Sequence, residues 1–270
     1  MEGDTMSLRL IAAAALLALS SGCTYWQKTE LTGRNHPSGW ADQIRIAAVE
    51  AYPYAQMSNN AYSDGERYDL GPDYSNPQNV PNDEIGFAYS VFERRGAGQL
   101  AEVIIAFRGT EGLLGRDMPH GNLLARQNPR GLAAYDRIRA ATDPQVAVNV
   151  TGHSLGGGIA THVSLQRPNV KSYIFNASPR FRANGTIPAN RRLSIVERGE
   201  LLKIFRAPGR EAPQTYISIN CTPGFAPVSQ HSIRQLADCL TRIAAWQDGG
   251  ARASLERNAS IGWPTGLPRG

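Results

Sequence analysis

The sequence predicts an α/β fold in which a mostly parallel sheet is flanked by helices. Residues 103–107 are a short apolar run, which is typical of a strand buried on both faces. A second apolar run, 146–150, leads into glycines and other small residues, the pattern of a strand, a sharp turn and a helix. Between these runs, Leu132, Tyr135 and Ile138 lie at helical spacing. Strand, helix and strand therefore alternate, as they do in a mostly parallel sheet.

The other elements are predicted from the same kinds of pattern. Residues 40–62 carry apolar side chains at helical intervals, and Pro53 is expected to kink or end that helix. Residues 63–81 are rich in Asn, Asp, Gly and Pro and are expected to form a long loop. Alternating apolar residues in 86–93 predict an antiparallel strand. Further strands are expected at 172–175, 193–196 and 215–219, and a last helix at Ile233, Leu236, Leu240 and Ile243.

Length and composition indicate one globular domain. The chain has 270 residues, of which 41% are hydrophobic and 19% are charged. We expect a signal peptide at 1–22, a tether at 23–39, the folded domain at 40–248 and a flexible tail at 249–270. The formal net charge is +5, but the arginines are scattered and no nucleic-acid motif is present, so we expect no nucleic-acid partner.

Ser154 is the candidate nucleophile. It is the central residue of G-H-S-L-G (152–156), where glycines flank the serine because larger side chains would not fit beside the sharp turn. Such a turn holds the serine exposed at the end of a parallel strand. The five residues alone also fit an ordinary tight turn. Upstream, Arg-Gly-Thr (108–110) marks an abrupt exit from the buried strand.

Two segments in this order, A-F-R-G-T (106–110) and G-H-S-L-G-G (152–157), resemble the signatures of the fungal-type, or class 3, lipases. The motifs cover about twenty residues, and the resemblance extends over roughly residues 40–246. It implies the α/β-hydrolase fold and hydrolysis of lipid acyl esters, of lipase or phospholipase type, without a cofactor. It also implies an oxyanion hole formed by the backbone N–H groups of Thr110 and Leu155. The sequence contains no cluster of Cys and His residues with the spacing of metal ligands, so we expect no metal site.

The general base is expected downstream, because this fold places its triad in the order serine, acid, histidine. Only His162 and His231 follow Ser154. His162 lies two turns into the helix after the serine, about 12 Å along its axis, and cannot return to the serine. His231 lies in the loop before the last helix and is the expected base.

The acid is expected to be a glutamate, because no aspartate lies between Ser154 and His231. Glu200 is the first acid beyond the strand at 193–196 and the turn that follows it, which favours Glu200. Glu197 and Glu211 remain alternatives. A glutamate can orient the imidazole as an aspartate does in the common Ser-His-Asp triad.

The N-terminus predicts export. Arg9 precedes an apolar run, 10–19, which is too short to span a membrane and suits a secretory signal. The run ends at Ser-Ser-Gly-Cys, which resembles a bacterial lipobox, so Cys23 is expected to carry lipid and to anchor the protein to a membrane surface of the cell envelope. Ser20 stands where leucine is usual, so an ordinary cleaved signal or a structural cysteine remains an alternative.

Two further expectations concern the neighbourhood of the site. Cys221 and Cys239 are a possible disulfide pair that would close a loop around His231, and two unpaired thiols are the alternative. Leucines and glycines at 112–115 and 123–124 flank a polar centre in the region where similar lipases carry a lid, and an ordinary surface loop is the alternative. A thioesterase, a soluble-ester esterase and a non-catalytic envelope binding module remain alternative functions, and the oligomeric state stays open.

Overall fold

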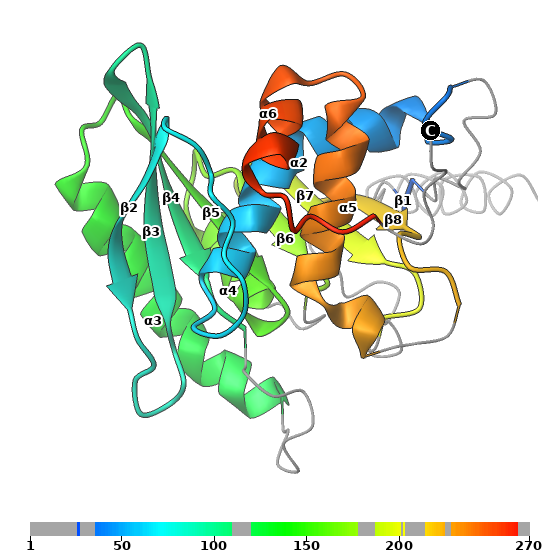
Figure 1. The fold of residues 1–270 in the computed structure, drawn as a ribbon. Helices are drawn as coiled ribbons and strands as arrows, with labels where there is room; N and C mark the ends of the chain where they lie inside the picture. The colour runs from blue at the N-terminus through cyan, green and yellow to red at the C-terminus, as the bar shows by residue number, and fades with distance from the viewer. Residues whose placement is uncertain are drawn as a thin grey trace, which may run out of the picture.

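The chain folds around one eight-stranded sheet with helices on both faces, in a computed structural model that describes residues 26–27, 36–109, 120–177, 187–200, 202, 214–224 and 228–263 (Figure 1). The side chains of residues 26–27 and 120–125 are not described. In chain order the elements are β1 (Trp26–Gln27), α2 (Asp42–Asn60), β2 (Tyr74–Val80), β3 (Tyr89–Gly96), β4 (Gln99–Phe107), α3 (His120–Ala141), β5 (Ala147–His153), α4 (Leu155–Gln166), β6 (Ser172–Phe175), β7 (Arg192–Glu197), β8 (Thr215–Ile219), the short 3-10 helix η2 (Ser229–His231), α5 (Ile233–Ala245) and α6 (Gly249–Arg257).

The sheet is mostly parallel. Its strand order is β1-β8-β7-β6-β5-β4-β3-β2, in which β4 to β8 run parallel and β2 and β3 form an antiparallel edge. The two-residue β1 adds a parallel pairing beside β8. This topology confirms the predicted α/β-hydrolase class of fold. It also brings the carboxyl ends of β5, β6 and β7 side by side at the same end of the sheet, where open α/β sheets bind their ligands.

Two hydrophobic layers enclose the sheet. Helices α2, α5 and α6 cover one face of the sheet, where their buried side chains pack mainly on β6, β7 and β8 (Figure 1). Helices α3 and α4 cover the opposite face and pack against β3, β4 and β5. In β4, Ile105 and Phe107 join the layer of α3 and α4, whereas Ile104 and Ala106 pack against Met57 of α2. The strand is therefore buried on both faces, as its unbroken apolar run predicts.

Helix α2 lies within the predicted helical segment 40–62, but it does not end at Pro53, which is one of the two outcomes expected there. Proline removes one helical hydrogen bond. The helix nevertheless persists to Asn60, because Ala48, Ala51 and Ala55 are fully buried against the sheet and α5. Tertiary packing of one helix face outweighs the local cost.

The predicted long loop at 63–81 contains a strand, β2, which is a correction to the sequence analysis. This edge strand is largely polar and exposed, so no apolar alternation marks it. Its pairing with β3 is irregular between Ser75 and Gln78, the stretch that holds Pro77. Proline is tolerated at such an edge irregularity because no ladder hydrogen bond is required there.

The predicted flexible tail also differs, since residues 249–257 form α6 and the chain stays docked to Ile261, which is buried. Asp248 caps the helix by accepting the Ala251 N–H at 2.7 Å. Asn258 then bonds both backbone groups of Asp69, accepting the N–H at 2.8 Å and donating to the carbonyl at 2.9 Å. Polar contacts of this kind leave no hydrophobic signature in the sequence.

The structure describes only part of the predicted N-terminal features and of the predicted lid. The signal peptide and Cys23 lie outside the described residues, whereas the predicted tether includes β1 and a turn at 36–39 in which Ser38 is buried. Residues 110–119 of the lid region also lie outside them, and 123–124 fall within α3. None of the helices in the described ranges has the length and apolar character that crossing a bilayer requires.

We predict that Asn258→Ala lowers the free energy of unfolding by about 1–3 kcal/mol, because it removes two part-buried hydrogen bonds to the backbone of Asp69. Glu256→Ala, at an exposed position of α6, is the control and should change stability by less than about 0.5 kcal/mol. Urea unfolding monitored by tryptophan fluorescence measures both. Equal stabilities for Asn258→Ala and wild type would mean that residues 249–263 are not docked in solution.

Candidate active site

The turn between β5 and α4 holds Ser154 in a strained conformation. Its backbone has φ +56° and ψ −123°, a region that residues other than glycine rarely adopt. The Ser154 N–H donates to the Phe175 carbonyl at 3.0 Å, and the Gly158 N–H donates to the Ser154 carbonyl at 3.3 Å. Strand, strained serine and helix follow one another without a linker, which is the geometry of a nucleophile elbow.

The glycines of the motif are required by close backbone approach. A Cβ on Gly156 would overlap the Phe107 carbonyl at the end of β4, and a Cβ on Gly152 would overlap Gly156 itself. Helix α4 therefore begins directly against the end of β4. The exit of β4 also lies close to the serine, since a Cβ on Gly109 would lie 3.0 Å from the Cβ of Ser154.

Ser154 is buried, with 4% of its surface exposed, where the sequence analysis expects an exposed serine. Part of this burial comes from the exit of β4, because Gly109 lies directly against the serine. A substrate must therefore enter a sheltered site. Shelter from water strengthens the electrostatic interactions inside such a site.

His231 and Glu200 form a buried hydrogen-bonded pair. His231 ends η2, just before α5, whose first turn is capped by Ser232. Nδ1 of His231 lies 2.8 Å from Oε2 of Glu200, and both side chains are at most 2% exposed. Glu200 Oε2 also accepts the Leu202 N–H at 2.8 Å. Because a carboxylate accepts hydrogen bonds, the proton of a neutral His231 sits on Nδ1.

The other ring nitrogen of His231 is then a lone-pair acceptor. Nε2 is buried and has no hydrogen-bond partner within the described part of the chain. A buried polar atom without a partner costs free energy, and such atoms are found where a substrate or a reacting group completes the site. In structures without substrate, the hydrogen bond between nucleophile and base is often long and tightens in the complex.

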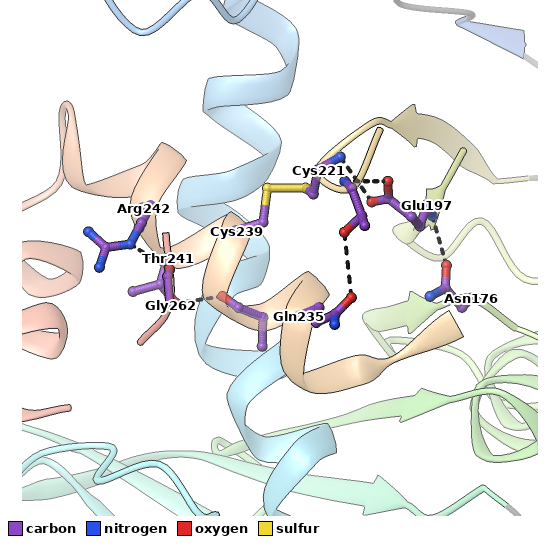
Figure 2. Close-up of a disulfide and its surroundings, with 10 residues drawn as sticks. Asn176, Glu197, Cys221, Gln235, Cys239, Thr241, Arg242 and Gly262 are labelled. Atoms are coloured by element: carbon purple, nitrogen blue, oxygen red, sulfur yellow. Dashed lines mark hydrogen bonds between the residues drawn. A yellow bond between two sulfur atoms is a disulfide. The ribbon is translucent and has the colours of Figure 1, made fainter. Parts of the chain in front are cut away.

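Glu197, the alternative acid, makes different contacts (Figure 2). It ends β7, and its carboxylate accepts the N–H of Cys221 at 3.1 Å and the N–H of Thr222 at 2.9 Å. Burial raises the pKa of Glu197 to about 7, although the two N–H groups oppose this shift. Glu197 therefore fixes the segment after β8, and Glu200 is the carboxylate that the structure brings to His231. Glu211 lies outside the described residues.

A disulfide joins Cys221, after β8, to Cys239 in the middle of α5 (Figure 2). Gln230 adds two bonds across the same stretch, donating to the carbonyls of Thr222 at 2.8 Å and Gly224 at 2.9 Å. The segment that carries His231 is thus tied to the end of β8 and to α5. These links place the imidazole next to the elbow.

Of the two predicted oxyanion donors, Leu155 is the first residue of α4, and Thr110 lies outside the described residues. The first N–H groups of a helix have no partner within the helix, and the Ser154 side chain makes no capping bond to them. The Leu155 N–H is therefore positioned beside the serine as a donor. Gly109, the residue before Thr110, lies against Ser154.

Two residues at the site had no predicted role. Tyr62, just beyond α2, bonds Nδ1 of His153 at 2.8 Å, and Asn176, just beyond β6, donates to the Gln230 carbonyl at 3.2 Å. These partners are 91 and 54 residues apart in the chain. No local pattern in the sequence could have linked them.

No protein-family model matches the chain, and no curated protein matches its sequence. Its structure is similar to those of fungal lipases, the group that the two motifs resemble. A triacylglycerol lipase from Penicillium expansum is 16% identical, over 65% of this chain and 81% of that chain, with a TM-score of 0.43. A lipase from Rhizopus microsporus var. chinensis is 16% identical, over 66% and 77%, with a TM-score of 0.44. The triacylglyceride lipase of Rhizomucor miehei is 16% identical, over 65% and 81%, with a TM-score of 0.41.

We predict that Glu197 makes stability depend on pH. Its pKa is about 7 in the folded protein and the ordinary value is about 4.5, so between these values the folded state keeps a proton that the unfolded chain has lost. The free energy of unfolding should therefore fall as the pH rises from about 4.5 to about 7. In Glu197→Gln this part of the decline should be absent.

Urea unfolding at several pH values measures the decline. Glu256→Gln removes an exposed carboxylate and is the control for net charge. Parallel pH profiles for wild type and Glu197→Gln would show that burial does not hold the proton on Glu197.

Proposed function

We propose that this chain is a serine carboxylic-ester hydrolase of lipase type, with Ser154 as nucleophile, His231 as general base and Glu200 as the orienting acid. The observation that carries the proposal is the buried hydrogen bond between Glu200 and Nδ1 of His231 at 2.8 Å, beside a strained serine elbow. That bond leaves Nε2 of His231 with its lone pair and without a partner in the described residues.

The reaction follows from these positions. Ser154 Oγ attacks the ester carbonyl carbon while its proton passes to Nε2 of His231, and Glu200 stabilises the resulting imidazolium. When the tetrahedral intermediate collapses, the bond to the alcohol breaks and the leaving oxygen takes that proton. Water then attacks the acyl-enzyme, again with His231 as base, and releases the acid and Ser154.

Negative charge develops on the carbonyl oxygen in both steps. The Leu155 N–H, at the N-terminus of α4, is oriented before the reaction and needs no reorganisation to stabilise that charge. We propose the Thr110 N–H as the second donor, because Gly109 already lies against Ser154. Loss of one such donor typically costs about 3 kcal/mol of transition-state stabilisation.

The substrate class is proposed from the motifs at 106–110 and 152–157, which resemble lipase signatures, and is an acyl ester of a lipid. Thioesters and short soluble esters are chemically open to the same triad. A panel of acyl chain lengths, head groups and leaving groups separates these substrates.

We also propose that the protein is exported and anchored through lipid on Cys23, as the N-terminal sequence predicts. A lipid anchor would hold the hydrolase at a membrane surface of the cell envelope. Mass spectrometry of the mature N-terminus tests this proposal, and a mature chain that begins elsewhere would contradict it.

We predict that Ser154→Ala abolishes both hydrolysis of a p-nitrophenyl ester and covalent labelling by a fluorophosphonate, because both require the Ser154 oxygen. Ser75→Ala, at an exposed position of β2, is the control and should retain both. Circular dichroism checks that each variant is folded. Turnover by Ser154→Ala at the rate of wild type would reject the proposed function.

We predict that Glu200→Gln lowers kcat by about 10³- to 10⁴-fold, because an amide no longer selects the tautomer with the proton on Nδ1. Glu197→Gln should lower kcat by less than about tenfold, because Glu197 contacts backbone groups of Cys221 and Thr222 rather than the imidazole. Steady-state kinetics on one ester compares the two matched substitutions. The opposite ranking would assign the orienting role to Glu197.

A further inference from the structure

We propose that His153 and Asn176 are positioning residues that hold the backbone of the general base by donating hydrogen bonds to two consecutive carbonyl groups. His153 Nε2 lies 2.7 Å from the His231 carbonyl oxygen, and Asn176 Nδ2 lies 3.2 Å from the Gln230 carbonyl oxygen. We call this pair of residues the base clamp. The inference rests on the proposed function, because it gives His231 the role of general base.

The hydrogen-bond partners of His153 determine which of its ring nitrogens carries the proton. A carbonyl oxygen can only accept, so Nε2 carries the hydrogen and donates it to His231. Nδ1 is then the acceptor, and the Tyr62 hydroxyl donates to it at 2.8 Å. Tyr62 therefore stabilises the tautomer of His153 that can hold the base.

His153 also has the charge state that this role requires. Burial, and then the neighbouring His231, hold the pKa of His153 well below its ordinary value. A neutral His153 keeps Nδ1 unprotonated. The ring centroids of His153 and His231 are 4.7 Å apart. A neutral His153 therefore places no second positive charge beside His231 when His231 becomes an imidazolium.

Asn176 completes the clamp from the adjacent strand. It directly follows β6, is fully buried and has a φ of +43°, a strained conformation that asparagine tolerates better than most residues. Its Oδ1 accepts the Glu197 N–H at 2.8 Å, which leaves Nδ2 facing the Gln230 carbonyl. Because His153 pairs with Phe175 between β5 and β6, the two clamp residues leave neighbouring strand ends.

The segment that they hold has little structure of its own. Helix η2 has three residues, and the disulfide partners Cys221 and Cys239 are ten and eight residues from His231 in the chain. Catalytic groups must be held within about 0.5 Å of the productive geometry. A displacement of about 1 Å can cost 10²-fold in rate. The base clamp supplies that precision where the backbone alone does not.

The test compares His153→Leu with His153→Gln in the full chain, using p-nitrophenyl butyrate as substrate. His153→Leu fills a similar volume but cannot donate, so kcat should fall by about 10²-fold while KM stays within about twofold. The side-chain amide of His153→Gln can donate to the same carbonyl and should recover at least tenfold of that loss. A purely space-filling role would give no such recovery, and equal kcat values for His153→Leu and wild type would overturn the proposal.

A second background tests whether the clamp acts through His231. In His231→Ala, adding His153→Leu should not lower the residual turnover further, because residues that act as one unit are not additive. An additional 10²-fold loss would show that His153 acts elsewhere and would overturn the proposal.

Tyr62→Phe keeps the test decisive if His153→Leu does not fold. It removes only the hydroxyl that donates to Nδ1, and kcat should fall by about 2- to 10-fold, the factor that one neutral hydrogen bond supports. A kcat equal to that of wild type would count against the clamp. Failure of the proposed function is distinguishable, because wild-type protein would then show neither ester turnover nor fluorophosphonate labelling at Ser154.

Discussion

The site depends on one close contact between backbone atoms, the approach of the first turn of α4 to the end of β4. At Gly156 there is no room for a Cβ, because the Phe107 carbonyl occupies that space, and Gly152 is equally close to the helix backbone. This contact sets the sharp turn that strains Ser154. It also brings the exit of β4, at Gly109, against the serine. A methyl group at Gly156 would separate strand and helix and would displace both the serine and the Leu155 N–H.

The second layer of organisation uses two glutamates that are three residues apart and have different surroundings. Glu197 ends β7 and bonds backbone N–H groups, which ties the strand to the disulfide-bearing segment after β8. Beyond the turn at Gly199, whose φ is +90°, Glu200 reaches His231 instead. One carboxylate thus supports the loop that carries His231, the proposed base, and the other is hydrogen-bonded to the imidazole of His231.

The sequence predicts most of the architecture that surrounds the serine, because the relevant signals are local. An apolar run marks β4, and the glycines around Ser154 mark the elbow, since each reflects a steric requirement of its own segment. The order of the triad along the chain leads to His231 without any structure. The sequence favours Glu200 but leaves Glu197 open, because the outcome depends on how the chain turns at Gly199.

The elements that sequence reasoning misses are held by polar and distant contacts. The edge strand β2 is exposed and polar, so it lacks the alternation that identifies strands. Helix α6 is secured by the Asp248 cap and by the bonds of Asn258 to Asp69, whose partners are 189 residues apart. The link from Tyr62 through His153 to the His231 carbonyl is equally non-local, and it appears only when three segments come together.

The most direct test of the central claim is a crystal structure of the protein after reaction with a fluorophosphonate. We expect a covalent bond from Ser154 Oγ to phosphorus and a phosphoryl oxygen within hydrogen-bond distance of the Leu155 N–H. We also expect Nε2 of His231 to lie within hydrogen-bond distance of Oγ or of the phosphonate ester oxygen, with Glu200 still bonded to Nδ1. An adduct on another residue, or an adduct at Ser154 with the His231 imidazole turned away and bonded elsewhere, would contradict the central claim.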